Sequence, residues 1–485
     1  MIAGLRPFQL SACDRVVEAV RHGSRVTILQ SPTGSGKSTM GADLVARALA
    51  RGKRILFIVH RRRLVDQFSD RLNDYHLGHG IIMRGRHLMP GQLCYVASRD
   101  TLLADGCEIP PADLVIVDEG RHAASPEFRA LLQPFEESGA RVILLDATPV
   151  GPDGRGLGPW AQAMVIADTT TRLIADGYLV PVKCYAPDRA KRNGQVRTKG
   201  VSGDLVASWE RYSERLPTVL FTSRVQHSTD AVDEFNRAGI PAAHVDAQTP
   251  DDTREAIFQG LKHGQYSVVS NVGIIKEGVD IPCLGCVQFF MDISGRVAFL
   301  QGCGRIMRPY PGKSHGVLID HAGAVFRHGF PDEDTHWSLD GNVDEEYKQR
   351  HDDGETPGAR YCSQCELLYH DSAECPQCGR LPEKPPRSIF APDPVDTTNE
   401  LLTEAERRVA TSSNGDRNER IQHWYRCLAV ARKRNGTYGM AAQVYKRKYG
   451  TWPEESFPSM PERWEWKHRV PARGLRNGAG WGEQF

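Results

Sequence analysis

The chain has 485 residues, a length that suggests roughly three domains, each with a core of its own. Its 61 basic and 60 acidic residues leave a net charge of +1, so the overall charge does not indicate a polyanionic partner. No apolar run approaches the ~18 residues of a membrane helix, and the first residues lack a signal-peptide pattern. The 12 cysteines are mostly scattered, so we expect a cytoplasmic protein without membrane segments, not a disulfide-stapled secreted one.

The first part of the chain alternates helical and strand patterns. A helix is predicted from residue 5 to about residue 21, with Pro7 in its first turn. The predicted strands are residues 26–29, 55–59, 114–117 and 142–145. The predicted helices between them are residues 40–50, 62–73 and 126–137. This alternation predicts a mostly parallel α/β sheet.

A second α/β pattern follows the Gly/Pro-rich residues 151–159, which predict a loop. Its predicted strands are residues 219–222, 242–245, 267–270, 287–291 and 317–320. Its predicted helices are residues 225–238 and 251–262. We therefore expect two tandem lobes, residues 1–168 and 169–330. The expected remainder is an acidic linker (331–357), a cysteine cluster (358–382), a Pro-rich linker (383–400) and a basic helical module with a tail (401–485).

A glycine-rich loop stands between the first strand and its helix. Residues 31–39 are Ser-Pro-Thr-Gly-Ser-Gly-Lys-Ser-Thr, with Ser31 in place of the first glycine of the general pattern. The glycines let backbone N–H groups converge on phosphate oxygens, and the helix N-terminus adds its positive end. The lysine reaches the outer phosphates, and the serine after it can ligate Mg²⁺. The loop predicts a nucleoside triphosphate site formed by Pro32, Thr33, Gly34, Ser35, Gly36, Lys37, Ser38 and Thr39.

Acidic residues follow two of the other predicted strands. Asp118 and Glu119 end one strand at the edge where open α/β sheets bind ligands. We expect Asp118 to hold Mg²⁺, directly or through water, and Glu119 to orient and deprotonate the attacking water. Asp146-Ala147-Thr148-Pro149 ends another strand in the same way, where a helix cap or a turn is the alternative interpretation.

Two arginines lie three residues apart in the second lobe. Arg305 and Arg308 belong to the segment Gln301-Gly302-Cys303-Gly304-Arg305-Ile306-Met307-Arg308. A helix would place both guanidinium groups on one face, from which they could stabilise charge on a γ-phosphate. A surface arginine pair is the alternative interpretation.

Together these motifs resemble those of superfamily 2 helicases and translocases over residues 5–320. The further matching segments are Arg6-Pro7-Phe8-Gln9, residues 59–67, residues 219–224 and residues 271–282. The resemblance implies two RecA-like lobes with an ATP·Mg²⁺ cleft between them. It places Arg6 and Gln9 at the adenine, residues 59–67 on the nucleic-acid backbone, and Gly278 and Asp280 at the nucleotide. It makes Gln301, Arg305 and Arg308 a catalytic motif beside Lys37, Asp118 and Glu119.

The chain also departs from the family pattern. Its acidic motif is Asp118-Glu119-Gly120-Arg121 where Asp-Glu-x-His is usual, and Asp146 stands where Ser or Thr is usual. Both positions couple nucleotide state to strand separation in the family. The finer resemblance is to phage and bacterial DNA-repair helicases of the RadD type, so we expect a DNA helicase or translocase. A double-strand translocase without strand separation and a nucleotide-gated binding protein with negligible turnover remain as alternatives.

Four cysteines form two Cys-x-x-Cys pairs nine residues apart: Cys362, Cys365, Cys375 and Cys378. This spacing predicts a structural zinc ribbon with four thiolate ligands, and a redox pair or an iron–sulfur site is the alternative. Cys283 and Cys286 have the same spacing without a second pair nearby, so we expect them in the core.

The last 85 residues are the basic part of the chain. They hold 16 Lys and Arg against 9 Asp and Glu, and five of the eight tryptophans. Interleaved aromatic and basic side chains can stack on bases and contact phosphates, and they can equally form a small helical core. We expect a nucleic-acid partner, DNA rather than RNA, and a possible protein partner at this module.

Overall fold

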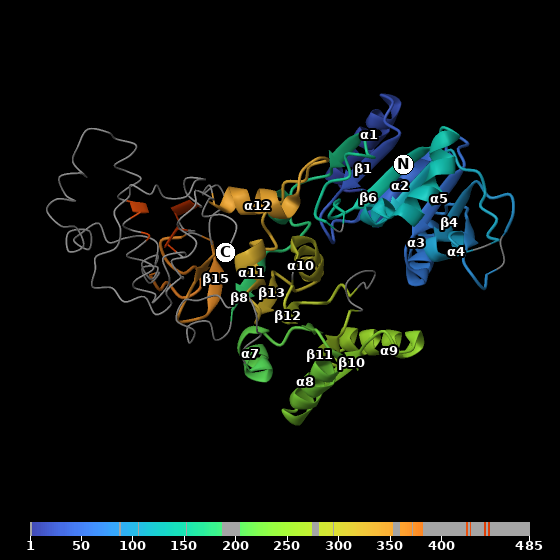
Figure 1. Cartoon of the computed structure of the whole chain (residues 1–485). Coiled ribbons are helices and arrows are strands. Elements are labelled where there is room, and N and C mark those ends of the chain that lie inside the picture. The colour runs from blue at the N-terminus through green and yellow to red at the C-terminus, as the bar shows by residue number, and fades with distance from the viewer. Residues whose placement is uncertain are drawn as a thin grey trace, which may run out of the picture. The chain divides into compact units, whose positions relative to one another are not determined.

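The structure is a computed structural model that describes residues 2–86, 89–104, 106–151, 153–186, 204–273, 281–293, 295–352, 359–370 and 372–381, and single positions between 423 and 446. The chain divides into two units, residues 1–384 and 385–485. The first unit contains two α/β lobes, which confirms the predicted fold class (Figure 1). The predictions for Gly278, Asp280 and residues 383–400 lie outside the described residues. The positions described within the predicted C-terminal helical region are helical.

The first lobe is built on seven parallel strands in the order β3-β4-β2-β5-β6-β1-β7. The strands are β1 (Val26–Gln30), β2 (Ile55–Val59), β3 (Gly80–Ile82), β4 (Cys94–Ser98), β5 (Leu114–Asp118), β6 (Arg141–Asp146) and β7 (Ala163–Ile166). The helices are α1 (Pro7–Arg21), α2 (Lys37–Leu49), α3 (Arg62–Asp74), α4 (Arg99–Leu102) and α5 (Pro126–Glu137), with a 3₁₀ turn η1 (Gly120–Ala124).

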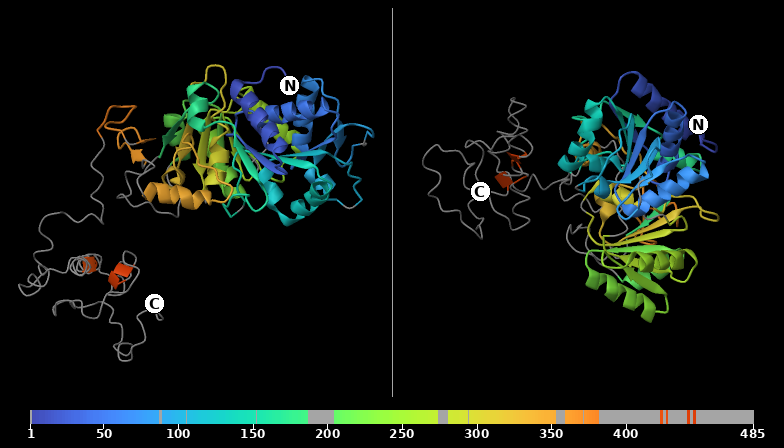
Figure 2. Two further views of the ribbon diagram at one scale, coloured as in Figure 1. Left: turned by 90° about the horizontal axis from the view of Figure 1, so that it is seen from above. Right: turned by 90° about the vertical axis from the view of Figure 1, so that its right-hand side faces the viewer.

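Helices cover both faces of this first sheet (Figure 2). Successive strand residues point to opposite faces, so Leu29 and Phe57 pack in the layer of α1, α2 and α3, while Ile28 and Leu56 pack in the layer of α5. Because all seven strands are parallel, their carboxyl ends meet at one edge of the sheet. The residues that follow β1, β5 and β6 therefore come together there.

The second lobe has an eight-stranded sheet in the order β10-β11-β9-β12-β13-β8-β15-β14. The strands are β8 (Val182–Tyr185), β9 (Thr218–Thr222), β10 (Ala242–Val245), β11 (Val268–Asn271), β12 (Cys286–Phe290), β13 (Gly316–Asp320), β14 (Arg360–Tyr361) and β15 (Leu367–Tyr369). The helices are α6 (Thr170–Ala175), α7 (Leu205–Tyr212), α8 (Val225–Arg237), α9 (Asp251–Lys262), α10 (Arg296–Cys303), α11 (Ala324–His328) and α12 (Val343–Asp352). The first six strands in this order are parallel, and β15 and β14 join them antiparallel.

A strap formed by residues 330–343 runs from the second lobe to the glycine-rich loop 151–158 of the first. Gly156 and Gly158 donate backbone hydrogen bonds to the strap carbonyls of Gly341 and Leu339, at 2.8 and 2.7 Å. A Cβ atom at Gly156 would lie 2.2 Å from the Leu339 carbonyl oxygen, so only glycine fits there. Trp337 of the strap packs with Val150 of the first lobe. Loop 151–158 is therefore shaped to receive the strap.

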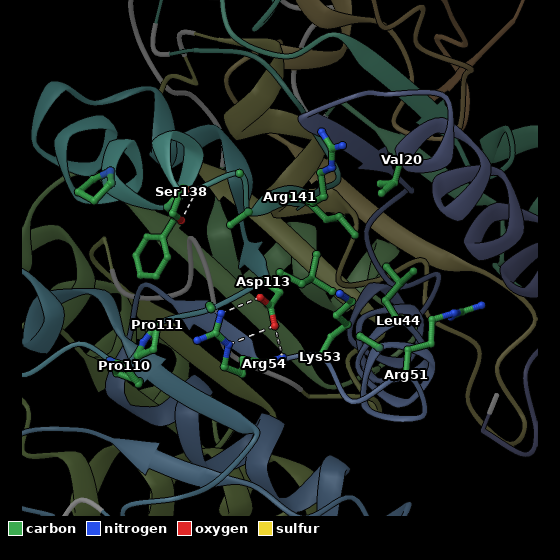
Figure 3. A pocket seen from close by; sticks show the side chains of 18 of the residues that line it. Val20, Leu44, Arg51, Lys53, Arg54, Pro110, Pro111, Asp113, Ser138 and Arg141 are labelled. Carbon is green, nitrogen blue, oxygen red and sulfur yellow. Dashed lines mark hydrogen bonds and ion pairs between the residues drawn. The ribbon is translucent and has the colours of Figure 1, made fainter.

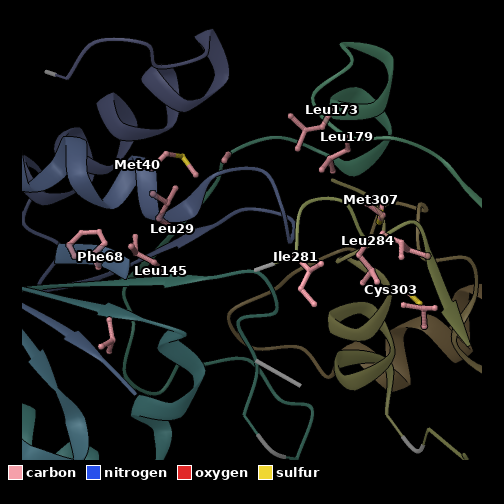
Figure 4. Packing of buried hydrophobic residues seen from close by; sticks show 14 of the residues in the cluster. Leu29, Met40, Phe68, Leu145, Leu173, Leu179, Ile281, Leu284, Cys303 and Met307 are labelled. Atoms are coloured by element: carbon pink, nitrogen blue, oxygen red, sulfur yellow. The ribbon is translucent and has the colours of Figure 1, made fainter. Parts of the chain in front are cut away.

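Buried hydrophobic side chains continue from one lobe to the other. One cluster contains Leu29, Met40 and Leu145 of the first lobe, Leu173 and Leu179 of the connecting segment, and Leu284, Cys303 and Met307 of the second (Figure 4). No helix among the described residues is both long and apolar enough to span a bilayer.

Candidate ATP site and zinc-ribbon-like cluster

The predicted phosphate loop joins β1 to α2, as expected. Gly34 and Gly36 have φ values of +88° and +97°, a region that glycine occupies without steric cost. Gly36 is the N-cap of α2, which begins at Lys37, so the first N–H groups of the helix face the loop. Ser31 is fully buried, and its hydroxyl lies 2.5 Å from the Ser35 hydroxyl. The serine that replaces the first glycine therefore makes a hydrogen bond within the loop.

Gln9 fastens this loop to the N-terminal segment. Its side-chain amide donates to the backbone oxygen of Ser35 at 2.8 Å, and its amide oxygen accepts from the backbone N–H of Arg6 at 3.0 Å. A Cβ atom at Gly36 would lie 2.4 Å from the amide nitrogen of Gln9. The Arg6 guanidinium lies over the Tyr178 ring, 4.7 Å from its centre. Tyr178 was not predicted as a site residue, because it follows α6 (Thr170–Ala175) and belongs to no motif recognised in the sequence.

The predicted acidic pair stands at the carboxyl end of β5. Burial raises the pKa of Asp118 to about 7, with a further rise from Glu119 and a lowering by Lys37. An oxygen of Asp118 accepts from the backbone N–H of Glu119 at 3.1 Å. Glu119 has a φ of +54°, a left-handed conformation that non-glycine residues rarely adopt. Such backbone strain is concentrated at functional sites, and it occurs here at the predicted general base.

Arg121 connects the acidic motif to Asp146. Its guanidinium pairs with Glu119 and with Asp146, the latter at 2.9 Å, and its backbone N–H donates to Asp146 at 2.7 Å. The Arg121 side chain is 8% exposed and that of Asp146 is 1% exposed, so the ion pair is buried. Asp146 also accepts from the backbone N–H of Thr148 at 2.8 Å. The two departures from the family pattern are therefore partners in one ion pair.

The network of Arg121 extends into the second lobe. With its side-chain amide turned so that the oxygen faces the guanidinium group, Gln301 accepts from both terminal nitrogens of Arg121, at 2.9 and 2.8 Å, and from the Thr148 hydroxyl at 3.0 Å. Gln301 lies on α10, while Arg121 and Thr148 follow β5 and β6. The Gln301 side chain thus contacts both the segment after β5, through Arg121, and the segment after β6, through Thr148.

The helix that would place Arg305 and Arg308 on one face does not extend to them. Helix α10 ends at Cys303, Gly304 is its cap, and both arginines lie in the turns that follow. Gly304 fits tightly against the phosphate loop, since a Cβ there would lie 2.4 Å from the Cβ of Thr33. A Cβ at Gly34 would in turn lie 2.8 Å from the Cγ of Arg308. The turns nevertheless bring Arg308 to the loop from the second lobe.

The first predicted nucleic-acid segment, residues 59–67, leads from β2 into α3. His60 is buried, whereas Arg62 is exposed and bonds to the Arg84 carbonyl at 2.9 Å. Arg63 pairs with Glu255 of α9 in the second lobe at 2.6 Å. Arg99, at the start of α4, was not predicted as a site residue and stands at the same edge of the sheet. Its strand, β4, has no recognised motif of its own in the sequence.

The four cysteines of the predicted zinc ribbon come together. Their sulfur atoms all lie within 4.8 Å of one another, and the Cys362–Cys378 and Cys365–Cys375 sulfurs are 3.5 and 3.6 Å apart. Tetrahedral zinc with Zn–S bonds of about 2.3 Å requires sulfurs roughly 3.8 Å apart, so the cluster is compatible with zinc. No other such cluster occurs among the described residues. Cys283 and Cys286 are buried in the core, as expected.

This zinc-ribbon-like cluster is built into the second lobe. Strand β15 pairs antiparallel with β8, with Leu367 opposite Tyr185. The Tyr185 hydroxyl donates to the Gln377 side chain at 2.7 Å, and the Tyr212 hydroxyl bonds to Glu366. Burial raises the pKa of Tyr185 to about 12, so this hydroxyl remains a donor at neutral pH.

The site therefore brings together most of the predicted ATP-site residues. The phosphate loop, the acidic pair and Asp146 share one edge of the first sheet, and the second lobe supplies Gln301 and Arg308. Arg305 is buried in the turn that follows α10. The arrangement can hold a triphosphate on backbone N–H groups and Lys37, place a carboxylate near attacking water, and set arginines against developing negative charge.

Two family models match the chain, one on each lobe. "Type III restriction enzyme, res subunit" matches residues 2–151, and "Helicase conserved C-terminal domain" matches residues 205–310.

Proteins with similar sequences include one from a phage and two from yeasts. A 51.5 kDa protein of Lactococcus phage (isolate 7-9) is 28% identical over 64% of this chain and 68% of its own length. The Schizosaccharomyces pombe protein assigned as mitochondrial ATP-dependent helicase irc3 is 25% identical over 67% of this chain. The chain spans 58% of that relative and 52% of its Saccharomyces cerevisiae counterpart IRC3.

Solved structures with the same fold include restriction enzymes. A fragment assigned as the HsdR subunit of a type I restriction enzyme from Vibrio vulnificus YJ016 matches 68% of this chain and 67% of its own, with a TM-score of 0.53 and 18% identity. The type ISP enzyme LlaBIII matches 72% of this chain and 29% of its own, with a TM-score of 0.51 and 16% identity. With both lobes matched by family models and the motifs gathered at their junction, the chain belongs to the superfamily 2 helicases.

Proposed function

We propose that this chain is an ATP-dependent motor that moves along DNA as a helicase or translocase. The observation that carries the proposal is the meeting of ATP-site groups from two lobes, with Arg308 against Gly34 and Gln301 bonded to Arg121. A site divided in this way couples hydrolysis to the movement of one lobe against the other. Two yeast relatives carry the name ATP-dependent helicase, and the family model on the first lobe is named for a restriction enzyme, a class that acts on DNA.

Residues of the first lobe would bind the nucleotide. The backbone N–H groups of residues 32–39 would hold the phosphates, with Lys37 on the outer ones. Ser38 and Asp118 supply the hydroxyl and carboxylate oxygens that Mg²⁺ prefers, and bound Mg²⁺ would neutralise phosphate charge. Arg6, Gln9 and Tyr178 would form the adenine side, because they meet beside the loop.

Glu119 is the proposed general base. With Glu119 paired to Arg121, its carboxylate is held in place beside the guanidinium group. Because Arg121 also binds Gln301, movement of the second lobe would change how firmly Glu119 is held. Arg305 and Arg308 would stabilise charge on the γ-phosphate when the lobes close.

The nucleic acid would run along the carboxyl edges of both sheets. Arg61, Arg62 and Arg99 follow strands of the first sheet at this edge, and Arg224 follows β9 in the second. Such side chains bind phosphates without reading bases, as a motor that moves along many sequences requires. The proposed domain division is residues 1–168, 169–330, 331–357, 358–382, 383–400 and 401–485. The four-cysteine cluster would hold zinc, and the last region would bind DNA or a partner protein.

ATP hydrolysis measured with single-stranded, double-stranded and forked DNA and with RNA tests the proposal. We expect DNA to stimulate hydrolysis, and Lys37→Ala to lower it about 100-fold or more, because the cation at the phosphates is lost. Glu119→Gln is the matched control: it should still bind ATP while losing turnover. Full activity in Lys37→Ala, or no stimulation by any nucleic acid, would contradict the motor.

Strand displacement on forked DNA separates the two forms of the motor. Stimulation by duplex DNA without displacement would indicate a double-strand translocase, which the unusual Arg121 and Asp146 favour because these positions couple nucleotide state to strand separation. Nucleotide binding with negligible turnover under all conditions would indicate a nucleotide-gated binding protein.

A further inference from the structure

A cavity of about 930 Å³ opens at the amino-terminal edge of the first sheet (Figure 3). The phosphate loop follows the carboxyl end of β1, so the cavity and the ATP site lie at opposite edges of this sheet. Its walls come from α1, α2, α5 and the segment before β5. We call it the basic groove, with an apolar floor that includes Val20, Leu44, Pro111, Leu131 and Phe135.

Positive charge rims the basic groove. Among its lining residues, Asp113 is the only acid, and it pairs with Arg54 at 2.8 Å. That pairing is firm, since hydrogen bonds from Arg54 lower the pKa of Asp113 to about 2. Arg47, also in the lining, is paired with Asp43 and Asp14.

Four further bases have no carboxylate partner within the part of the chain that the structure describes. Arg51 donates to the Arg47 carbonyl at 2.9 Å, and Arg141 lies 3.4 Å from the Gly23 carbonyl. Arg21 and Lys53 stand exposed at the rim. The groove thus offers several uncompensated cations around an apolar floor, a combination that complements an acidic and partly apolar partner.

Nucleic acid fits this surface poorly. Single-strand binding surfaces present exposed aromatic rings for base stacking, whereas the one aromatic side chain lining the groove, Phe135, is buried. The concave apolar floor offers nothing to a phosphate backbone. The basic residues 401–485 of the chain itself carry the wrong charge for the groove.

We propose that the basic groove binds an acidic peptide segment with apolar side chains, contributed by a partner protein. Apolar side chains of the segment would fill the floor, and its carboxylates would meet the four rim bases. Because exposed ion pairs contribute little individually, the floor would supply most of the affinity, and the rim would supply attraction and selectivity. The partner would bind without obstructing the ATP site, since the groove and the ATP site lie at opposite edges of the sheet.

Selection from peptide libraries tests this proposal on the full-length chain. One display library is built from Asp, Glu, Phe, Leu and Ile, and the matched library replaces the acids with Lys and Arg. We expect binders from the acidic library only. Their Kd, measured by fluorescence polarisation, should rise about tenfold or more in Arg21→Glu/Lys53→Glu, because two attractions become repulsions. Binding should also weaken with added salt.

Arg237→Glu/Lys262→Glu is the matched control, since it reverses two exposed bases on α8 and α9, away from the groove. It should leave peptide binding unchanged, and both variants should keep the melting temperature and basal ATP hydrolysis. The proposal is overturned if the acidic library yields no binder, or if the binders hold equally well to the groove variant. The proposal is also overturned if the groove variant keeps peptide binding but loses binding of a single-stranded oligonucleotide, or if it keeps peptide binding but no longer self-associates.

Discussion

Replacing Arg121 by methionine should destabilise the first lobe through the charge left behind at Asp146. Methionine keeps the length and apolar stem of the side chain while removing the cation. Breaking a buried ion pair costs about 3–5 kcal/mol because one charge stays buried without its partner. Asp146 keeps two backbone N–H donors, those of Arg121 and Thr148, so we expect a value near the lower end, about 3 kcal/mol.

The second replacement completes a double-mutant cycle. Asp146→Ser alone should also destabilise, since it leaves the guanidinium of Arg121 buried with less negative charge. The double variant Arg121→Met/Asp146→Ser removes both charges, so its loss should fall short of the sum of the single losses by about 2–3 kcal/mol. Differential scanning calorimetry measures the effect: each single variant should melt about 6–12 °C lower, at about 2–4 °C per kcal/mol for a lobe of this size.

Additive losses would refute the reasoning. If the double variant loses as much as the two single variants together, the ion pair contributes no coupling and the contact in the structure is incidental. DNA-stimulated hydrolysis gives a second measurement. It should stay low in Arg121→Met and in the double variant alike, because both lack the contact between Arg121 and Gln301.

Three further predictions concern glycines and the metal. Gly36→Ala should weaken ATP binding, because its φ of +97° strains an L side chain and the new Cβ would displace the Gln9 amide that fastens the loop. Gly52→Ala, with positive φ in open space, should cost about 1–2 kcal/mol but keep ATP binding. Gly156→Ala should destabilise by about 1–3 kcal/mol by pushing the strap away, whereas Gly78→Ala, with open space around it, should change nothing measurable. Metal analysis should find about one zinc per chain, and its removal by a chelator should speed amide exchange in β8 and β15. Four thiols that label freely in the native chain would contradict the zinc site.

The sequence predicts best what is local. A strand, a glycine loop and a helix are adjacent in the chain, so the phosphate loop and the acids after β5 and β6 are recognisable from neighbouring residues. Contacts between residues far apart in the sequence are not recognisable in this way. Tyr178 reaches Arg6 across more than 170 residues, and the pairing of Arg121 with Asp146 depends on β5 and β6 lying side by side.

The end of α10 shows why local helix arguments fail. The three-residue spacing of Arg305 and Arg308 suits a helix, but Gly304 is needed where the backbone meets Thr33 of the other lobe. Packing between the lobes therefore decides where the helix stops. The pairing of β15 with β8 could not be predicted either, because most of the second lobe separates the two strands in the sequence.

The strap means that the chain crosses between the lobes more than once. It passes from the first to the second lobe after β7, returns to loop 151–158 as the strap, and goes back through α12, where Tyr347 packs on Arg296 of α10. Two bodies joined at one point can swivel freely, whereas bodies held at two separated points turn mainly about the line that joins them. The glycines that seat the strap thus add a second chain connection between the lobes, which restricts the directions in which one lobe can turn against the other.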